Sequence, residues 1–151
     1  MMISKTAIDK FLSQKTLAVV GVSRNTKKFG NLAYKELKSK GYKLYPIHPV
    51  MKDYDGETCY ASLSNLPEKV GGVLITVAPE KTEKIVKEAK ELGIDNIWIQ
   101  QRSESEKAIS YGKENGLNLI HHECILMYAN PVGFPHSIHR TIWKIIGKLI
   151  K

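Results

Sequence analysis

The sequence predicts an α/β protein with a doubly wound parallel sheet between helices, a three-layer α/β/α arrangement. Two observations support this fold class. Short, mostly apolar runs alternate along the 151 residues with amphipathic segments of helical period. Glycines follow these amphipathic segments where a helix would end. Since no repeat, linker or low-complexity stretch interrupts the alternation, we expect a single domain over residues 1–151.

The first half of the chain is expected to hold a leading helix, one longer helix and three strands. Phe29, Ala33 and Leu37 recur every four residues and would share one helix face, and Gly41 suits the residue after the last turn. The expected elements, in chain order, are a helix at 6–14, a strand at 16–22, a helix at 29–41, a strand at 42–47 and a short strand at 57–62.

The second half continues the alternation. Pro79 fits the first turn of a helix that Gly93 would end, and Ser103 with Glu106 reads as a capping box for the next helix, closed by Gly116. The expected elements are a strand at 71–78, a helix at 79–93, a strand at 95–100, a helix at 104–115 and a strand at 117–122.

Six strands joined by right-handed crossovers predict the sheet order 3-2-1-4-5-6. In such a sheet a ligand binds outside the carboxyl ends of the strands, beside the first strand, where the order reverses. Four segments would therefore share one binding edge, at residues 21–30, 77–79, 100–102 and 122–124.

Composition favours an anionic small-molecule ligand. The formal net charge is +8 at pH 7, although lysines on solvated faces would give the same value. Cys59 and Cys124 lie far apart with no CxxC, which is typical of a reducing compartment. No apolar stretch approaches the roughly 20 residues of a membrane helix. We therefore expect a cytoplasmic protein whose partner is a small molecule rather than nucleic acid.

The stretch GVSRNTKKFG, from Gly21 to Gly30, joins the first strand to the longer helix. Gly21 allows a tight turn and Gly30 allows close packing of helix on strand. Free N–H groups and the positive end of the helix dipole would face a ligand there. Ser23, Arg24 and the lysines at 27 and 28 could bind phosphate oxygens. A plain turn with exposed lysines is the alternative.

The loop does not match the usual NAD fingerprint. G-x-G-x-x-G is absent, since Val22 and Ser23 follow Gly21 and the next glycine is Gly30. An acidic residue would normally end the second strand and bind the ribose hydroxyls, but His48 stands there between two prolines. Neutral or basic groups at this position suit a phosphorylated ribose. NADP and coenzyme A both carry one.

The ordered motifs G-V-S-R-N-x-x-K-F-G, YPIHP, DGETCYASLSNLP, ITVAPE, LGIDNIWIQ and ECILM resemble the small stand-alone CoA-binding proteins. These proteins are related to the CoA-binding domain of the succinyl-CoA synthetase alpha subunit. The resemblance covers residues 16–127. It implies a Rossmann-like fold and binding of coenzyme A without an activity of its own.

The resemblance also implies a set of ligand-binding residues. The phosphate and pantetheine side would be lined by Gly21, Val22, Ser23, Arg24, Lys28, Phe29 and Gly30; the adenosine side by Pro46, His48 and Pro49; and the pantetheine wall by Val77, Ala78 and Pro79. Two departures stand out. Thr26 replaces a frequent proline, and Gln101 with Arg102 occupies the place of a glycine-containing turn.

A second cluster of chemically active residues follows the last strand. His121 and His122 are adjacent on a strand and would point to opposite faces, so we expect no metal site. Cys124 reads either as a small buried hydrophobe or as a thiol with His122 on the same side. The sequence offers no recognisable catalytic group here.

The C-terminal segment, residues 131–151, has an apolar stripe with basic residues beside it. We expect an extension helix that caps the core or a homodimer interface, in preference to one that lies on an anionic membrane. The sequence as a whole indicates a protein that binds coenzyme A or an acyl-CoA and is not an enzyme. The alternatives are an NADP-dependent oxidoreductase and a CoA-sensing regulatory interaction module.

Overall fold

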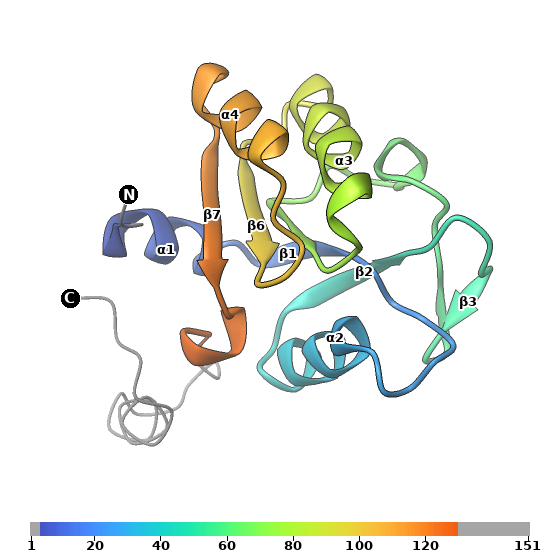
Figure 1. Ribbon diagram of the computed structural model, residues 1–151. Coiled ribbons are helices and arrows are strands. Elements are labelled where there is room, and N and C mark those ends of the chain that lie inside the picture. Colours follow the sequence, from blue (N-terminus) through green and yellow to red (C-terminus); the bar gives the residue numbers. More distant parts are fainter. Residues whose placement is uncertain (1–3, 130–151) are drawn as a thin grey trace, which may run out of the picture.

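A computed structural model of the chain describes residues 4–129, and Figure 1 shows it. The helix expected at 131–151 lies outside the described residues. The four α-helices in this range are α1 (Lys5–Leu12), α2 (Phe29–Ser39), α3 (Pro79–Glu91) and α4 (Glu106–Glu114). The strands of the main sheet are β1 (Thr16–Val20), β2 (Lys43–Ile47), β5 (Gly72–Ile75), β6 (Asn96–Gln100) and β7 (Asn118–Glu123).

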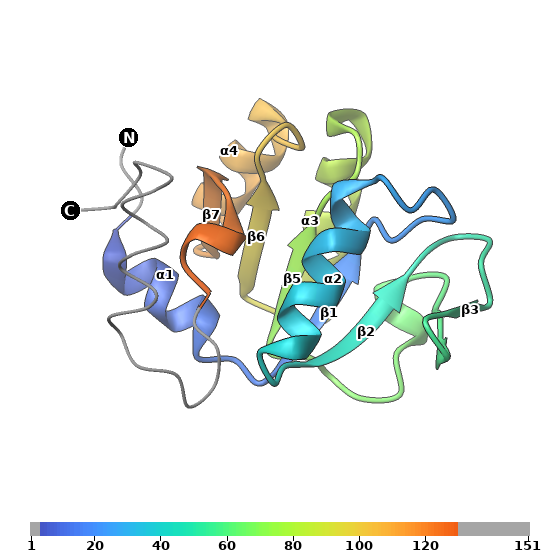
Figure 2. The same ribbon diagram turned by 90° about the horizontal axis from the view of Figure 1, so that it is seen from below.

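All five strands run parallel, in the order β2-β1-β5-β6-β7. Helices α1 and α2 cover one face of this sheet, and α3 and α4 cover the other (Figures 1 and 2). Since helices bury both faces, strands such as β1 and β5 are apolar along their length rather than alternating. The α/β/α fold expected from the sequence is confirmed.

The two faces of the sheet carry separate cores. Leu17 and Val19 of β1 pack with α1 and α2, whereas Ala18 and Val20 pack on the side of α3 and α4. This division follows from the two-residue period of a strand. Trp98 of β6 is fully buried in the core on the side of α1 and α2. Its ring packs edge-on against that of Phe11 of α1, with the ring centroids 5.4 Å apart.

The expected order 3-2-1-4-5-6 is wrong at its first position. Residues 57–62 do not form a sixth full strand, because β4 (Glu57–Thr58) folds back on β3 (Asp53–Tyr54) as an antiparallel pair. Asp55 and Gly56 both have positive φ, at 53° and 77°, and such a two-residue turn closes a tight hairpin. Only Tyr60 meets the edge of β2, through one parallel bridge to Ile47.

The helix ends follow the expectation, with one exception at the start of α4. Glycines with positive φ follow α2, α3 and α4 by two residues, at 41, 93 and 116, as the sequence predicts. The capping box at the start of α4 is wrong, because Ser105 is the N-cap and accepts the Ala108 N–H. Ser103 is instead buried, and its C=O accepts the Thr82 hydroxyl at 2.7 Å.

Candidate functional site

The residues proposed from the sequence come from three neighbouring strands. The loop at 21–28 follows β1, His48 and Pro49 follow β2, and Val77 with Ala78 joins β5 to α3. Because β2, β1 and β5 are adjacent and parallel, these segments meet at the carboxyl edge of the sheet, as the blue loop and the end of β2 do in Figure 2. Pro46 lies inside β2 and is buried, so the structure does not bring its ring to this edge.

Two glycines let the loop and α2 lie directly against the end of β5. A Cβ on Gly21 would sit 1.9 Å from Thr76 Oγ1, and a Cβ on Gly30 would sit 2.2 Å from the Gly21 carbonyl oxygen. Thr76 Oγ1 in turn donates to the Val20 carbonyl at 3.0 Å. Sequence reasoning identified both glycines but missed Thr76, which fixes the end of β1 to the end of β5.

Asn31, in the first turn of α2, holds the shape of the loop. Its Oδ1 accepts the Ser23 N–H at 2.8 Å, and its Nδ2 donates to the carbonyls of Ser23 at 2.7 Å and Asn25 at 3.1 Å. The loop adds bonds of its own, from the Asn25 N–H to Ser23 Oγ and from the Lys27 N–H to Asn25 Oδ1. Sequence reasoning missed Asn31 as well. A polar residue next to Gly30, in the buried first turn of the helix, was a signal that its side chain binds the loop.

The loop presents three cations to solvent. Arg24, Lys27 and Lys28 are exposed, and within residues 4–129 no carboxylate lies within ion-pair distance of them. Lys28 is the N-cap of α2, so its backbone adjoins the first-turn amides of Phe29 and Gly30, and its side chain leaves from this end of the helix. Cations next to helical N–H groups form a favourable place for an anion.

His48 stands on the other side of this loop. Its Nδ1 accepts the N–H groups of Val50 and Met51, both at 3.0 Å, so the neutral ring carries its proton on Nε2. Desolvation lowers the pKa of His48 below its ordinary value, and the positive charges of Arg24 and Lys81 lower this pKa further. Lys81, in the first turns of α3, is a cation near this edge that sequence reasoning missed.

Apolar side chains line the edge between these polar groups. Val22 is buried, Phe29 and Val77 are half-buried, and Ala78 and Pro79 are exposed at the start of α3. Pro79 is the first residue of α3, as expected. The segment that follows β5 can thus offer an apolar surface beside the cationic loop.

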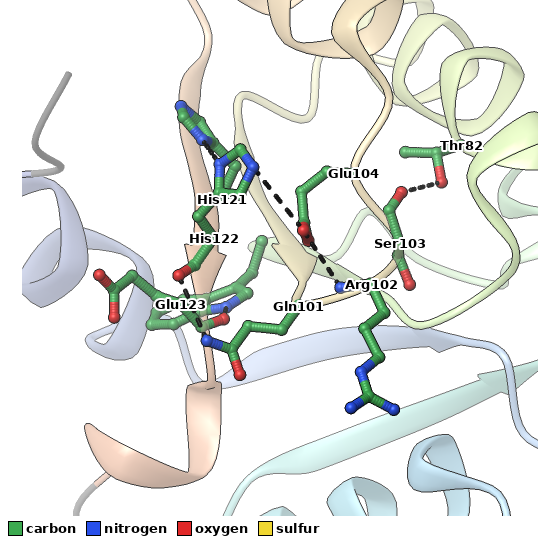
Figure 3. A network of polar contacts seen from close by, with 9 residues as sticks. Thr82, Gln101, Arg102, Ser103, Glu104, His121, His122 and Glu123 are labelled. Carbon is green, nitrogen blue, oxygen red and sulfur yellow. Dashed lines mark hydrogen bonds and ion pairs between the residues drawn. The ribbon is translucent and has the colours of Figure 1, made fainter. Parts of the chain in front are cut away.

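The ends of β6 and β7 carry a second polar cluster, drawn in Figure 3. The expectation that His121 and His122 point to opposite faces is wrong, because their Nδ1 atoms lie 2.6 Å apart. The pairing of β6 with β7 shifts register here and His122 has φ 61°, so the alternation of a regular strand is lost. His122 Nε2 also lies 3.8 Å from Glu104 Oε1.

Within residues 4–129 no group of three or more His, Cys, Asp or Glu side chains could hold a metal ion. In the same part of the chain no helix is long and apolar enough to cross a membrane. Cys124 follows β7 and is half-buried, whereas Cys59 is buried.

A cavity of about 330 Å³ lies away from this edge, between α2, β2 and the β3–β4 hairpin. Its two lysines are already paired, Lys38 with Asp55 at 3.2 Å and Lys43 with Glu68 at 2.7 Å. Because the positive charges there are neutralised, this cavity is a poorer place for an anionic ligand than the loop after β1.

The fold and this edge define an α/β domain with a cationic, glycine-bounded loop at the switch point of its sheet. The chain matches the family described as CoA binding domain over residues 15–130, and it belongs to that family. It is 27% identical over 123 residues to the uncharacterized protein YneT of Bacillus subtilis. This alignment covers 81% of this chain and 91% of that protein.

The chain is also similar to part of a larger enzyme. It is 24% identical over 129 residues to the alpha subunit of acetate–CoA ligase [ADP-forming] II of Pyrococcus furiosus, and it spans only 28% of that subunit. Among solved structures it resembles a conserved hypothetical protein of P. furiosus, with a TM-score of 0.71 at 33% identity over 74% of this chain and 97% of that one. A hypothetical protein from Pyrococcus horikoshii aligns with a TM-score of 0.74 at 27% identity. The alignment covers 81% of this chain and 86% of that one.

Proposed function

We propose that this domain binds coenzyme A or an acyl-CoA at the carboxyl edge of β2, β1 and β5, without turning it over. The proposal depends chiefly on the loop at 21–28. Asn31 holds this loop in place beside the start of α2, and the loop exposes three cations that have no ion pair among residues 4–129. The diphosphate would lie on this loop, and the pantetheine arm on the apolar surface at Val77–Pro79.

His48 supports a ligand with a phosphorylated ribose. It occupies the end of β2, where an acidic residue would favour a free ribose diol. Arg24 and Lys81 add positive charge around the same ring. NADP shares this feature with coenzyme A, so the choice between them depends on the family, whose description names CoA binding.

Absence of turnover is the second part of the proposal. The ligase subunit to which the chain is similar is more than three times the length of the matched part. The domain therefore corresponds to one segment of that enzyme, and we propose that binding, rather than the ligase reaction, is the property the two share.

The proposal is tested by native mass spectrometry of the purified protein and by thermal unfolding with added ligands. Coenzyme A at about 100 times its dissociation constant should stabilise the folded state by about 2.7 kcal/mol, a shift of roughly 5–10 °C. NAD at equal concentration should shift the midpoint far less. A larger shift with NADP than with CoA would favour the oxidoreductase alternative, and consumption of acetyl-CoA by the pure protein would contradict the absence of turnover.

A further inference from the structure

The turn after β6 contains an arginine in a conformation that favours glycine. The Ser103 N–H donates to the Gln100 C=O at 2.9 Å and closes a four-residue turn in which Arg102 is third. Arg102 has φ 75°, as the third residue of a type II turn does, and glycine is the usual occupant of that place. A side chain there strains the backbone, and strained residues of this kind are more frequent at functional sites than elsewhere.

Three side chains hold this strained turn, two from the loop between β6 and α4 and one from α3. Glu104 Oε1 accepts the Arg102 N–H at 3.1 Å, and the Thr82 hydroxyl of α3 donates to the Ser103 carbonyl at 2.7 Å. Gln101 Nε2 donates to the His122 carbonyl at 3.4 Å, which ties the turn to β7 (Figure 3). The backbone of Arg102 is therefore fixed, and with it the direction in which the side chain leaves the turn.

The guanidinium itself remains available to a ligand. Arg102 is exposed, and in the described part of the chain no carboxylate lies within ion-pair distance of it. Figure 3 shows the guanidinium pointing away from Glu104 and His122, toward the side of β1 and β2. The turn follows β6, which lies two positions from β1, so roughly 10 Å of sheet separates it from the end of that strand. An extended arginine side chain is long enough to span much of this distance.

We infer that Arg102 binds an anionic group of the same ligand whose phosphates the loop at 21–28 holds; this rests on the proposed function. The cations at 24–28 approach the ligand from the β1 side of the edge, and Arg102 approaches it from the β6 side. A guanidinium can form two parallel hydrogen bonds with a phosphate or a carboxylate. The anion is thus either a phosphate of the nucleotide or a carboxylate at the acyl end.

The test uses two variants that separate charge from strain, and one control. R102G removes the charge and relieves the positive φ, whereas R102Q removes the charge and keeps a Cβ at that φ. K15Q removes an exposed positive charge at the opposite, amino-terminal edge of the sheet. Binding of CoA, 3′-dephospho-CoA, butyryl-CoA and succinyl-CoA is measured by calorimetry at one salt concentration, and unfolding by thermal melting.

Both Arg102 variants should weaken binding about tenfold, as the loss of a charge-assisted hydrogen bond does, and K15Q should change it less than twofold. R102G should also melt about 2 °C higher than the wild type, and R102Q at the same temperature. An equal loss for CoA, butyryl-CoA and succinyl-CoA assigns the anion to the nucleotide, and 3′-dephospho-CoA shows whether it is the 3′-phosphate. A loss confined to succinyl-CoA assigns it to the acyl carboxylate.

Two results would overturn the inference. Either both variants bind every ligand within twofold of the wild type, or R102G alone loses affinity, which would mean that the turn's backbone matters and the charge does not. A wild-type protein that binds none of the four ligands would instead overturn the proposed function, and Arg102 with it.

Discussion

Asn31 and Ser23 are joined by two hydrogen bonds that run in opposite directions. The Ser23 N–H donates to Asn31 Oδ1 at 2.8 Å, and Asn31 Nδ2 donates to the Ser23 C=O at 2.7 Å. The asparagine side chain is only 7% exposed, so these bonds are largely shielded from water. The loop after β1 is therefore ordered before a ligand arrives, and binding does not have to supply the free energy of ordering it.

Removing this side chain should weaken CoA binding more than it weakens the fold. Asn31→Ala leaves the Ser23 backbone groups without their partner, and we expect a loss of about 1–3 kcal/mol in the free energy of unfolding. Because the loop then has to be ordered on binding, affinity should fall at least tenfold, with a less favourable binding entropy in calorimetry.

Val86→Ala is the matched control, since Val86 of α3 is fully buried against the other face of the sheet and its truncation also destabilises the protein. If V86A and N31A lose affinity equally, Asn31 acts only through stability.

Reversing the charge of Lys28 should separate binding from folding. Lys28→Glu removes a cation from the loop but places an anion at the N-terminus of α2, which the helix dipole favours. We expect the midpoint of urea unfolding to stay the same or rise slightly, and CoA affinity to fall more than tenfold with a weaker dependence on salt.

Lys15→Glu makes the same change of charge at an exposed position before β1, at the far edge of the sheet. Equal losses from K28E and K15E would mean that net charge, and not the loop, attracts the ligand.

His48 should make stability depend on pH. Its folded-state pKa is lowered by desolvation and then by Arg24 and Lys81, so between that value and the ordinary pKa of about 6.5 the unfolded chain binds more protons. This contribution to stability is fully present above pH 7 and is lost as pH falls through 6.5 toward the folded-state pKa.

His48→Asn tests this, because an amide oxygen can accept the Val50 and Met51 N–H groups in place of Nδ1 and does not titrate. The thermal midpoints of the two proteins should keep a constant difference from pH 7.5 to 8.5. As pH falls to 5.5, the midpoint of H48N should rise relative to that of the wild type. Parallel curves over the whole range would show that His48 does not contribute.

Cys124 should react with CoA disulfide in preference to Cys59. Burial raises the pKa of the Cys59 thiol, whereas Cys124 is half-buried at the carboxyl end of β7, on the ligand edge. Its strand lies three positions from β1, roughly 14 Å, a span that the pantetheine arm could cross. Attack of the Cys124 thiolate would form a mixed disulfide and release one CoA thiolate.

Peptide mapping by mass spectrometry locates the adduct, and the Cys124→Ser variant should show none. An adduct on Cys59 alone, or on neither cysteine, would leave Cys124 as a packing residue beside Ile125.

The local features of this fold were determined by the sequence. Apolar runs marked the strands at 16–20 and 72–75, and glycines at 41, 93 and 116 ended the helices, because these signals depend on the conformational preferences of neighbouring residues. Gly21 and Gly30 could be named for the same reason, since a tight turn and a close helix contact leave no room for a side chain.

Only the tertiary structure decided how distant groups meet. The segment expected as a strand at 57–62 starts in a hairpin with β3, because the turn at Asp55 and Gly56 folds β4 back on it, and it reaches β2 through Tyr60 alone. Folding brings loops and strands from distant parts of the chain beside Asn31, Thr76 and Arg102, and these neighbours give the three residues their roles. The hydrophobic periodicity of the sequence does not reveal such contacts. The sequence by itself determined the fold class and the loop; the close packing of three strand ends decided which side chains hold that loop in place.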